Sequence, residues 1–269
     1  MSVARALTIA GSDSGGGAGI QADLKTFSAL GVYGASVITA VTAQDTQRVY
    51  DFVELAPAFV AAQIDAVLGD IGADAVKTGM LSSAPIVEAV AERLQRWEVT
   101  TLVVDPVMVA KAGDRLLRED AVEALKSKLL PLALVVTPNI PEAEVIVGRE
   151  LKTWDDLREA AREIHAMGAR NVVMKGGHRV DEATATDVLF DGQTFREFSV
   201  GRVDTTSTHG TGCTLASAIA ATLAKGESVE HAVMAAKAYV TRALQEAFPL
   251  GRGHGPVHHF YRWWRPIGD

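Results

Sequence analysis

Cysteine, basic charge and long apolar runs are all scarce in this sequence of 269 residues. Cys213 is the only cysteine, so no disulfide forms within the chain, and this usage predicts a reducing compartment such as the cytoplasm. The formal net charge is −7 and no basic stripe is present, which argues against nucleic acid as a partner. The apolar run at residues 6–10 is too short for a signal peptide, and residues 129–136 are too few to span a membrane, so no membrane partner is expected.

Hydrophobic residues make up 48% of the sequence, enough for a substantial core, and they form strand-like and helix-like segments in alternation. The strands are expected at residues 6–10, 32–43, 49–55, 75–78, 102–104, 134–136, 172–174, 188–190 and 195–198. The helices are expected at residues 20–30, 57–68, 84–97, 119–129, 142–147, 154–167, 215–224 and 229–247. An irregular, aromatic-rich tail follows from residue 251, and its histidines 258 and 259 are expected at a surface or an interface.

This alternation predicts an α/β fold with a mostly parallel central sheet and helices on both faces. The pair Asp191-Gly192 separates two short strands and predicts a hairpin, the antiparallel exception near one edge of the sheet. No linker, repeat or low-complexity block divides the chain, so we expect one domain spanning residues 1–269. In such folds ligands bind beyond the carboxyl ends of the strands.

The most informative stretch is residues 209–214, two glycines directly before an apolar helix. Glycines permit a tight turn, and the first N–H groups of a helix, together with its dipole, attract an anion. Gly210, Thr211 and Gly212 are therefore candidate anion-hole residues. Cys213 begins the helix, where the dipole is expected to lower its pKa, although a free cysteine is often only part of a core. An anion cradle beside an ionisable group suits phosphoryl transfer.

The glycine-rich loop at residues 11–19 fits neither common nucleotide motif. A P-loop needs Lys and then Ser or Thr after its last glycine, and the dinucleotide fingerprint needs a glycine where Ile20 stands. Because the loop follows a strand and opens a helix, close approach of a small ligand is still expected. Asp23, one turn into that helix, is a candidate acceptor for a substrate amine or hydroxyl, or else a solvated carboxylate.

Further polar residues stand at or just after expected strand ends. Gln44 carries an amide that both donates and accepts, so it can pair with the edge of an aminopyrimidine or simply form a turn. Asp105, Asn139 and Glu142 offer the oxygen ligands that suit Mg²⁺. Lys175 is a candidate ligand for a nucleotide phosphate. Residues 209–214 are called the anion turn below. Together with this turn, these residues favour a kinase.

In their order and spacing, these motifs resemble the hydroxymethylpyrimidine/phosphomethylpyrimidine kinases of thiamine biosynthesis, in the ribokinase-like superfamily. The resemblance covers essentially the whole chain, and its most specific parts are residues 11–23, 41–44, 104–108, 137–139 with Glu142, and 208–214. It implies a ribokinase-like fold, a homodimer, and ATP-dependent phosphorylation of 4-amino-5-hydroxymethyl-2-methylpyrimidine and then of its monophosphate.

The resemblance also implies roles for individual residues. It places Gln44, Asp23, Gly11 and Met80 around the pyrimidine, Gly210, Thr211 and Gly212 at the anion hole, Cys213 as the base, Asn139 and Glu142 with magnesium and phosphate, and Lys175 on the nucleotide phosphate. Asp45 and Arg48 depart from the family pattern, which often has Asn and Gly there.

Two alternatives remain open. A pyridoxine kinase of the same superfamily would also act on a hydroxymethyl group of an aromatic nitrogen ring, although Gln44 and the loop before Asp23 favour an aminopyrimidine. A non-catalytic regulator that binds a pyrimidine or nucleotide would need neither a base nor a metal site, so Asp105, Glu142 and Cys213 argue against it. We therefore expect an enzyme that uses ATP and Mg²⁺.

Overall fold

A computed structural model describes residues 3–108, 119–177 and 183–264, so the end of the expected tail, residues 265–269, lies outside the described residues. The strands are β1 (Arg5–Ser12), β2 (Tyr33–Gln44), β3 (Val49–Glu54), β4 (Ala75–Thr78), β5 (Leu102–Val104), β6 (Val135–Val136), β7 (Val172–Lys175), β8 (Thr184–Phe190) and β9 (Phe195–Gly201). The α-helices are α1 (Gly19–Ala29), α2 (Pro57–Asp70), α3 (Ala84–Arg96), α4 (Glu119–Ala124), α5 (Ile140–Val147), α6 (Trp154–Ala166), α7 (Thr211–Ala224) and α8 (Val229–Gln245).

All of these strands join one sheet in the order β3-β2-β1-β4-β5-β6-β7-β8-β9. Strands β2, β1, β4, β5, β6 and β7 pair in parallel, as predicted. The predicted hairpin is confirmed by antiparallel pairing of β8 with β9. The prediction of antiparallel pairing at one edge only is wrong, because β3 also runs antiparallel to β2. The connection between β2 and β3, residues 45–48, is shorter than the roughly dozen residues that a parallel crossover needs.

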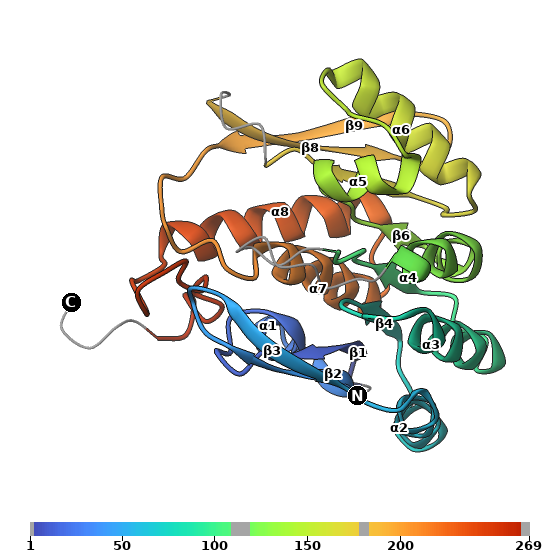
Figure 1. The fold of residues 1–269 in the computed structure, drawn as a ribbon. Coiled ribbons are helices and arrows are strands. Elements are labelled where there is room, and N and C mark those ends of the chain that lie inside the picture. The colour runs from blue at the N-terminus through green and yellow to red at the C-terminus, as the bar shows by residue number, and fades with distance from the viewer. Residues whose placement is uncertain (1–2, 109–118, 178–182, 265–269) are drawn as a thin grey trace.

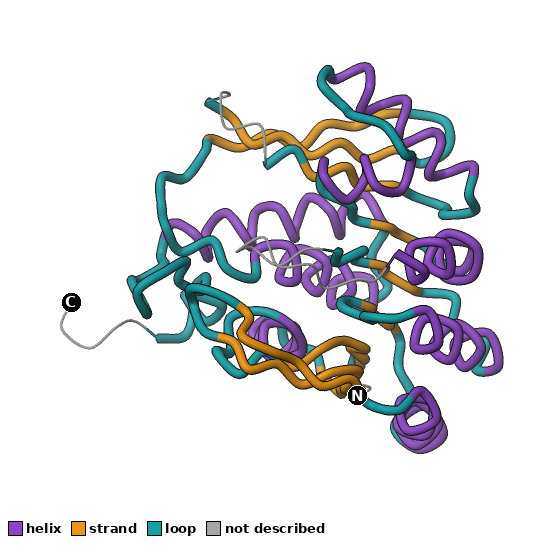
Figure 2. The backbone as a smooth tube through the Cα atoms, viewed as in Figure 1, coloured by secondary structure: helices purple, strands orange, loops and turns teal. Residues whose placement is uncertain are grey.

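Helices cover both faces of the sheet, as the alternation of elements predicted (Figures 1 and 2). Strand β5 shows how the sequence specifies these two layers: Leu102 and Val104 pack in one apolar cluster with side chains of α2–α6. Val103, between them, points into the opposite cluster with side chains of α1, α7 and α8. A strand buried on both faces in this way needs apolar residues at every position.

The strand order places the ligand site. From β1 the sheet continues through β2 to one edge and through β4 to the other, so the order reverses at β1 and β4. Ligands of open parallel sheets bind beyond the carboxyl ends of the strands at such a reversal. The loop after β1 and residue Gly79 after β4 occupy this place, and Gly79 N–H donates to Ile9 O at 3.0 Å. Of the helices described, none is both long and apolar enough to cross a membrane.

Candidate active site

Asp13 organises the glycine-rich loop after β1, a role that the sequence did not predict. Its carboxylate accepts hydrogen bonds from the N–H groups of Gly15, Gly17 and Ala18 at 2.8, 3.0 and 2.8 Å. It also accepts from His209 Nε2 at 2.8 Å. Burial would raise the pKa of Asp13, but the hydrogen bonds from His209 and the loop hold it below its usual value. An aspartate two residues before a glycine is a turn signal that could have identified it.

The anion turn lies against this loop at Gly210, and a second close approach, at Gly19, shapes the loop itself. Gly210, with φ +77°, caps α7, and a Cβ there would lie 1.8 Å from Gly17 O. Gly19 has φ +54°, and its Cβ would lie 2.3 Å from Gly11 O. Only glycine fits such approaches of backbone to backbone. The first bond of α7 runs from Thr214 N–H to Gly210 O at 2.8 Å, and Thr211 N–H donates to Thr208 O at 3.4 Å. The N–H groups of Gly212 and Cys213 therefore stand at the helix start, a position that suits an anion.

Gln44 ends β2 beside this loop. Its backbone exchanges two hydrogen bonds with Ser14 Oγ, both 2.8 Å. Its side-chain Oε1 accepts from Thr42 Oγ1 at 3.3 Å, and its Nε2 lies 3.5 Å from His209 Nε2. The structure therefore brings the predicted pyrimidine-reading amide to the loop and the anion turn.

Gly11 and Met80 lie together, at the ends of two neighbouring strands. A Cβ on Gly11 would meet Met80 Sδ at 3.1 Å, so both residues belong to one wall of the site. The placement is compatible with the pyrimidine pocket that the resemblance implies, and a side chain at position 11 would crowd the Met80 thioether.

Asp23 is placed differently from its prediction. Its side chain is 0% exposed and accepts from Thr8 Oγ1 at 2.6 Å, Ser217 Oγ at 2.6 Å and Lys77 Nζ at 2.9 Å. Direct contact with a substrate is not supported by this geometry, because protein groups already engage both carboxylate oxygens. Lys77 was missed, although a lysine inside an otherwise apolar central strand is a visible signal. Burial would lower the pKa of Lys77, but the negative charges of Asp23, Cys213 and Asp105, together with the hydrogen bond to Asp23, outweigh it and raise that pKa.

Cys213 lies close enough to this buried ion pair for the charges of Lys77 and Asp23 to act on its thiol. It lies one helical turn before Ser217, the residue that donates to Asp23, so both project from the same face of α7. The expectation of a lowered pKa is wrong here: burial raises the pKa of the Cys213 thiol to about 11. The positive charge of Lys77 acts in the opposite direction, and the negative charges of Asp23 and Asp105 add to the rise.

A second charged cluster lies on the other side of the anion turn. Lys175 Nζ, at the end of β7, is 2.8 Å from Asp105 Oδ1 and 3.6 Å from Glu142 Oε2. A Cβ on Gly212 would lie 3.3 Å from Lys175 Nζ and 3.8 Å from Asp105 Oδ2. The structure thus brings these predicted nucleotide and metal residues to the anion hole. Lys175 comes from β7, Glu142 from α5, and Asp105 from the position directly after β5.

Asn139 and Glu142 also cap α5. Asn139 Oδ1 accepts from Glu142 N–H at 2.9 Å, and Glu142 Oε2 accepts from Asn139 N–H at 2.8 Å, a reciprocal capping box. The pKa of Glu142 is raised to about 7, mainly by burial. The charge of Lys175 acts to lower this pKa, and the charge of Asp105 acts to raise it. Glu142 therefore exists in both its protonated and its ionised form near neutral pH.

The donor set fits Mg²⁺ only in a limited way. Among the residues that the structure describes, no group of three or more His, Cys, Asp or Glu side chains is placed to hold a metal. Asp105 and Glu142 provide two carboxylates with Lys175 between them. Mg²⁺ in nucleotide sites commonly takes one or two carboxylates and completes its shell with phosphate oxygens and water. The pair therefore fits a Mg²⁺ that arrives with a nucleotide.

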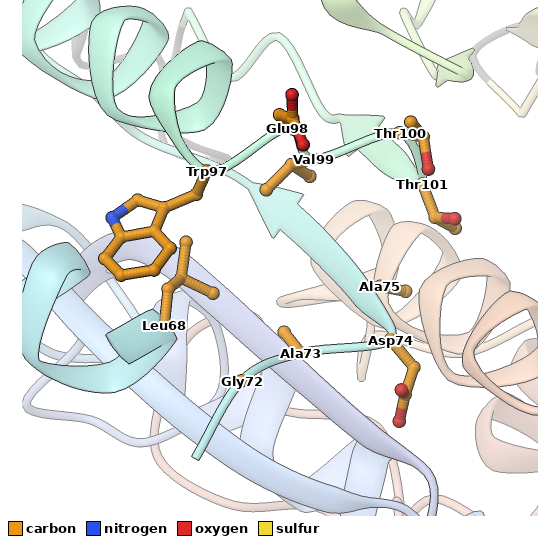
Figure 3. A pocket seen from close by; sticks show the side chains of 10 residues that line it. All are labelled: Leu68, Gly72, Ala73, Asp74, Ala75, Trp97, Glu98, Val99, Thr100 and Thr101. Carbon is orange, nitrogen blue, oxygen red and sulfur yellow. The ribbon is translucent and has the colours of Figure 1, made fainter. Parts of the chain in front are cut away.

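A cavity of about 200 Å³ lies elsewhere, at the amino ends of β4 and β5 (Figure 3). Its lining includes Leu68, Trp97 and Asp74, and the Asp74 carboxylate is paired with Arg5 at 2.8 Å. None of the predicted site residues lines this cavity. This cavity is therefore separate from the predicted site residues.

Residues 13–258 match the sequence model of a family described as phosphomethylpyrimidine kinase. The chain belongs to this family. Its matched range includes most of the described site, from Asp13 to Cys213.

Three relatives illustrate the similarity. The hydroxymethylpyrimidine/phosphomethylpyrimidine kinase of Rhizobium meliloti is 55% identical over 265 residues, covering 97% of this chain and 98% of that protein. The thiamine biosynthesis bifunctional protein ThiED of Geobacter sulfurreducens is 55% identical over 253 residues, 94% of this chain, which spans about half (51%) of that longer protein. The crystal structure of an ADP complex of Bacillus subtilis pyridoxal kinase superposes with a TM-score of 0.90 at 44% identity, covering 96% of this chain and 98% of that one. The predicted ribokinase-like fold is thus confirmed for this member of the phosphomethylpyrimidine kinase family.

Proposed function

We propose that this protein transfers the γ-phosphoryl group of ATP to 4-amino-5-hydroxymethyl-2-methylpyrimidine and then to the resulting monophosphate. One observation carries the proposal: the Gly210 turn lies between an amide suited to a pyrimidine edge, Gln44, and a lysine suited to a nucleotide phosphate, Lys175. A single site then holds both substrates on either side of the phosphoryl group. Family membership supports the pyrimidine as the acceptor, and the ADP bound to a similar kinase supports the nucleotide as the donor.

In this mechanism the substrate hydroxymethyl oxygen attacks the γ-phosphorus in line. The new oxygen–phosphorus bond forms as the bond to the β,γ-bridging oxygen breaks, and the hydroxyl proton passes to the Cys213 thiolate. The N–H groups of Gly212 and Cys213 stabilise charge on the phosphoryl oxygens, and Lys175 neutralises the nucleotide phosphates. Asp105 and Glu142 would hold Mg²⁺, which would supply further neutralisation of phosphate charge.

Pyridoxal kinase activity is the second candidate, favoured by the TM-score of 0.90 to a pyridoxal kinase. Both substrates carry a hydroxymethyl group on an aromatic nitrogen ring. An exocyclic amine next to a ring nitrogen offers Gln44 a matched donor and acceptor. Relative kcat/KM for the pyrimidine and for pyridoxal, measured through ADP release, therefore separates the two functions.

We further propose a homodimer in the cytoplasm, using the edge formed by β2 and β3. Val41 and Val53 face each other across these strands and are exposed, and Tyr50 and Phe59 nearby are exposed as well. An edge strand with adjoining exposed apolar side chains favours association with a second copy. The single cysteine is compatible with a reducing compartment.

Replacing Gln44 with alanine tests the pyrimidine assignment. The change should leave polar groups of the bound substrate unpaired and cost about 1–3 kcal/mol of transition-state binding. That corresponds to a fall of roughly 5- to 150-fold in kcat/KM for the pyrimidine. Gln47→Ala, at an exposed position in the same loop, is the matched control and should retain the wild-type value. Equal kcat/KM for Gln44→Ala and wild type would remove Gln44 from the binding site.

The Mg²⁺ requirement should depend on pH through Glu142. A carboxyl group with a pKa raised to about 7 is protonated below that pH and cannot hold a cation. The Mg²⁺ concentration for half-maximal rate is therefore expected to fall as pH rises from about 6 to about 8. Glu142→Gln should need more Mg²⁺ and lose this dependence, whereas Asp105→Asn should need more Mg²⁺ but keep it. Mg²⁺ titrations that coincide for both variants and wild type would contradict these roles.

A further inference from the structure

The C-terminal segment, residues 251–259, lies beside the loop that follows Gln44 (Figure 1). Arg252 N–H and Gly253 N–H donate to Thr46 Oγ1 at 3.2 and 3.1 Å, and His254 N–H donates to Thr46 O at 2.9 Å. A Cβ on Gly253 would lie 2.1 Å from Thr46 O, so glycine is needed for this approach. The tail therefore holds the loop on the Gln44 side of the site.

The same segment also holds the anion turn. His209 N–H donates to Gly255 O at 2.9 Å. Further along, His259 Nε2 lies 3.1 Å from Thr214 Oγ1, which in turn donates to Gly210 O at 2.8 Å. The expectation of a surface or interface pair of histidines in the tail is wrong, because His258 and His259 are only 3% and 4% exposed within the single chain.

The number of available protons determines which group donates in each hydrogen bond between His259, Thr214 and Gly210. The Thr214 hydroxyl has one proton, and Gly210 O can only accept it. When both bonds are made, His259 must therefore donate its Nε2–H to Thr214 Oγ1. Burial, with smaller contributions from Lys25 and His258, lowers the pKa of His259 to about 3, so the imidazole is neutral and the chain of bonds does not change around neutral pH.

We propose that His259 is a positioning residue of the anion hole, acting through Thr214 on the Gly210 peptide. Gly210 O receives both the backbone N–H and the hydroxyl of Thr214, which fixes the carbonyl direction at the N-terminus of α7. A peptide is planar, so the Thr211 N–H of the same peptide is fixed as well, and with it the first turn of α7 that carries the N–H groups of Gly212 and Cys213. This inference rests on the proposed function, since it assigns those N–H groups to the transferred phosphoryl group.

The neighbouring histidine provides a matched control. His258 is equally buried, but its Nε2 faces Trp264 O at 3.0 Å rather than the anion turn. Misplacement of catalytic groups by about 1 Å can cost roughly 100-fold in rate. We expect His259→Leu to lower kcat by roughly 10- to 100-fold with KM for the pyrimidine changed by less than about twofold. His258→Leu should keep kcat near wild type, and His259→Gln, which keeps a donor, should recover part of the loss.

Thr214→Val removes the hydroxyl in the middle of the same chain of bonds and serves if His259→Leu fails to fold. Its loss in kcat should match that of His259→Leu, and the double variant should lose little more, because both changes break one connection. Equal losses in His259→Leu and His258→Leu, or additive losses in the double variant, would overturn the proposal.

A readout independent of turnover separates this inference from the proposed function. Cys213 is the only cysteine and lies on the turn that His259 positions, so its alkylation by iodoacetamide reports the geometry of the turn. The alkylation rate should change in His259→Leu and Thr214→Val and stay at the wild-type value in His258→Leu. A wild-type enzyme that phosphorylates no pyrimidine would contradict the proposed function alone, whereas unchanged alkylation in both variants would contradict the positioning role.

Discussion

Replacing Cys213 with alanine is expected to lower kcat by about 10²- to 10⁴-fold, the usual worth of a general base. KM for ATP should change by less than about twofold, because alanine keeps the N–H groups that receive the phosphate. Single-turnover measurements at saturating ATP give the rate of the chemical step directly. An alanine variant with close to the wild-type rate would show that the cysteine only packs and that the anion hole alone supports the reaction.

The pH dependence of the wild-type enzyme sharpens this test. With the thiol pKa raised to about 11, the thiolate fraction grows as pH increases through the neutral range, and kcat should rise with it. Cys213→Ala should flatten that profile. Cys213→Asp should restore part of the rate at neutral pH, since the pKa of a carboxyl group starts about 4 to 5 units below that of a thiol and the group stays ionised even when burial raises its pKa. If kcat of the wild-type enzyme does not change with pH while Cys213→Ala has a low kcat, Cys213 positions other groups and is not the base.

Replacing Lys77 with methionine is expected to lower the free energy of unfolding by about 3–5 kcal/mol, because it leaves the buried Asp23 carboxylate without its partner. Urea denaturation measures this loss. The paired change Lys77→Met with Asp23→Leu should recover much of it, since no charge then remains buried. An unfolding free energy for Lys77→Met equal to that of wild type would contradict a tightly paired state.

The same substitution should also affect the active-site thiol. Lys77 is the positive charge that opposes the raised pKa of Cys213, so Lys77→Met should slow alkylation of Cys213 at a fixed pH. Lys237→Met is the matched control: Lys237 forms a buried pair with Asp187 at 2.8 Å on β8, and its loss should leave alkylation unchanged. Equal alkylation rates in Lys77→Met and Lys237→Met would show that the Lys77–Asp23 pair does not influence the Cys213 thiol.

The fold was largely predictable because local patterns specify it. Buried strands such as Leu102–Val104 are apolar throughout, and Thr153 with Asp156 forms the capping box that opens α6. The antiparallel placement of β3 was missed because its signal is the length of a connection, not the pattern of the strand. Elements were thus easier to predict than the directions in which they pair.

The site was predictable as a list of residues but not as a network. Sequence position cannot show that Asp23 reaches Lys77, 54 residues away, rather than a ligand. It also cannot show how strongly burial acts on Cys213, so the helix-start argument alone gave the wrong sign for its pKa. Contacts between distant parts of the chain, such as Asp13 with His209, carry no local signal of their partner.

Phosphorus NMR of one reaction containing the enzyme, ATP, Mg²⁺ and 4-amino-5-hydroxymethyl-2-methylpyrimidine tests the central claim most directly. We predict that a pyrimidine monophosphate signal appears first and that signals of the pyrimidine diphosphate replace it in the same sample, with Gln44→Ala slowing both steps. Absence of any phosphorylated pyrimidine, in a preparation that phosphorylates pyridoxal or that binds ATP without transfer, would contradict the account.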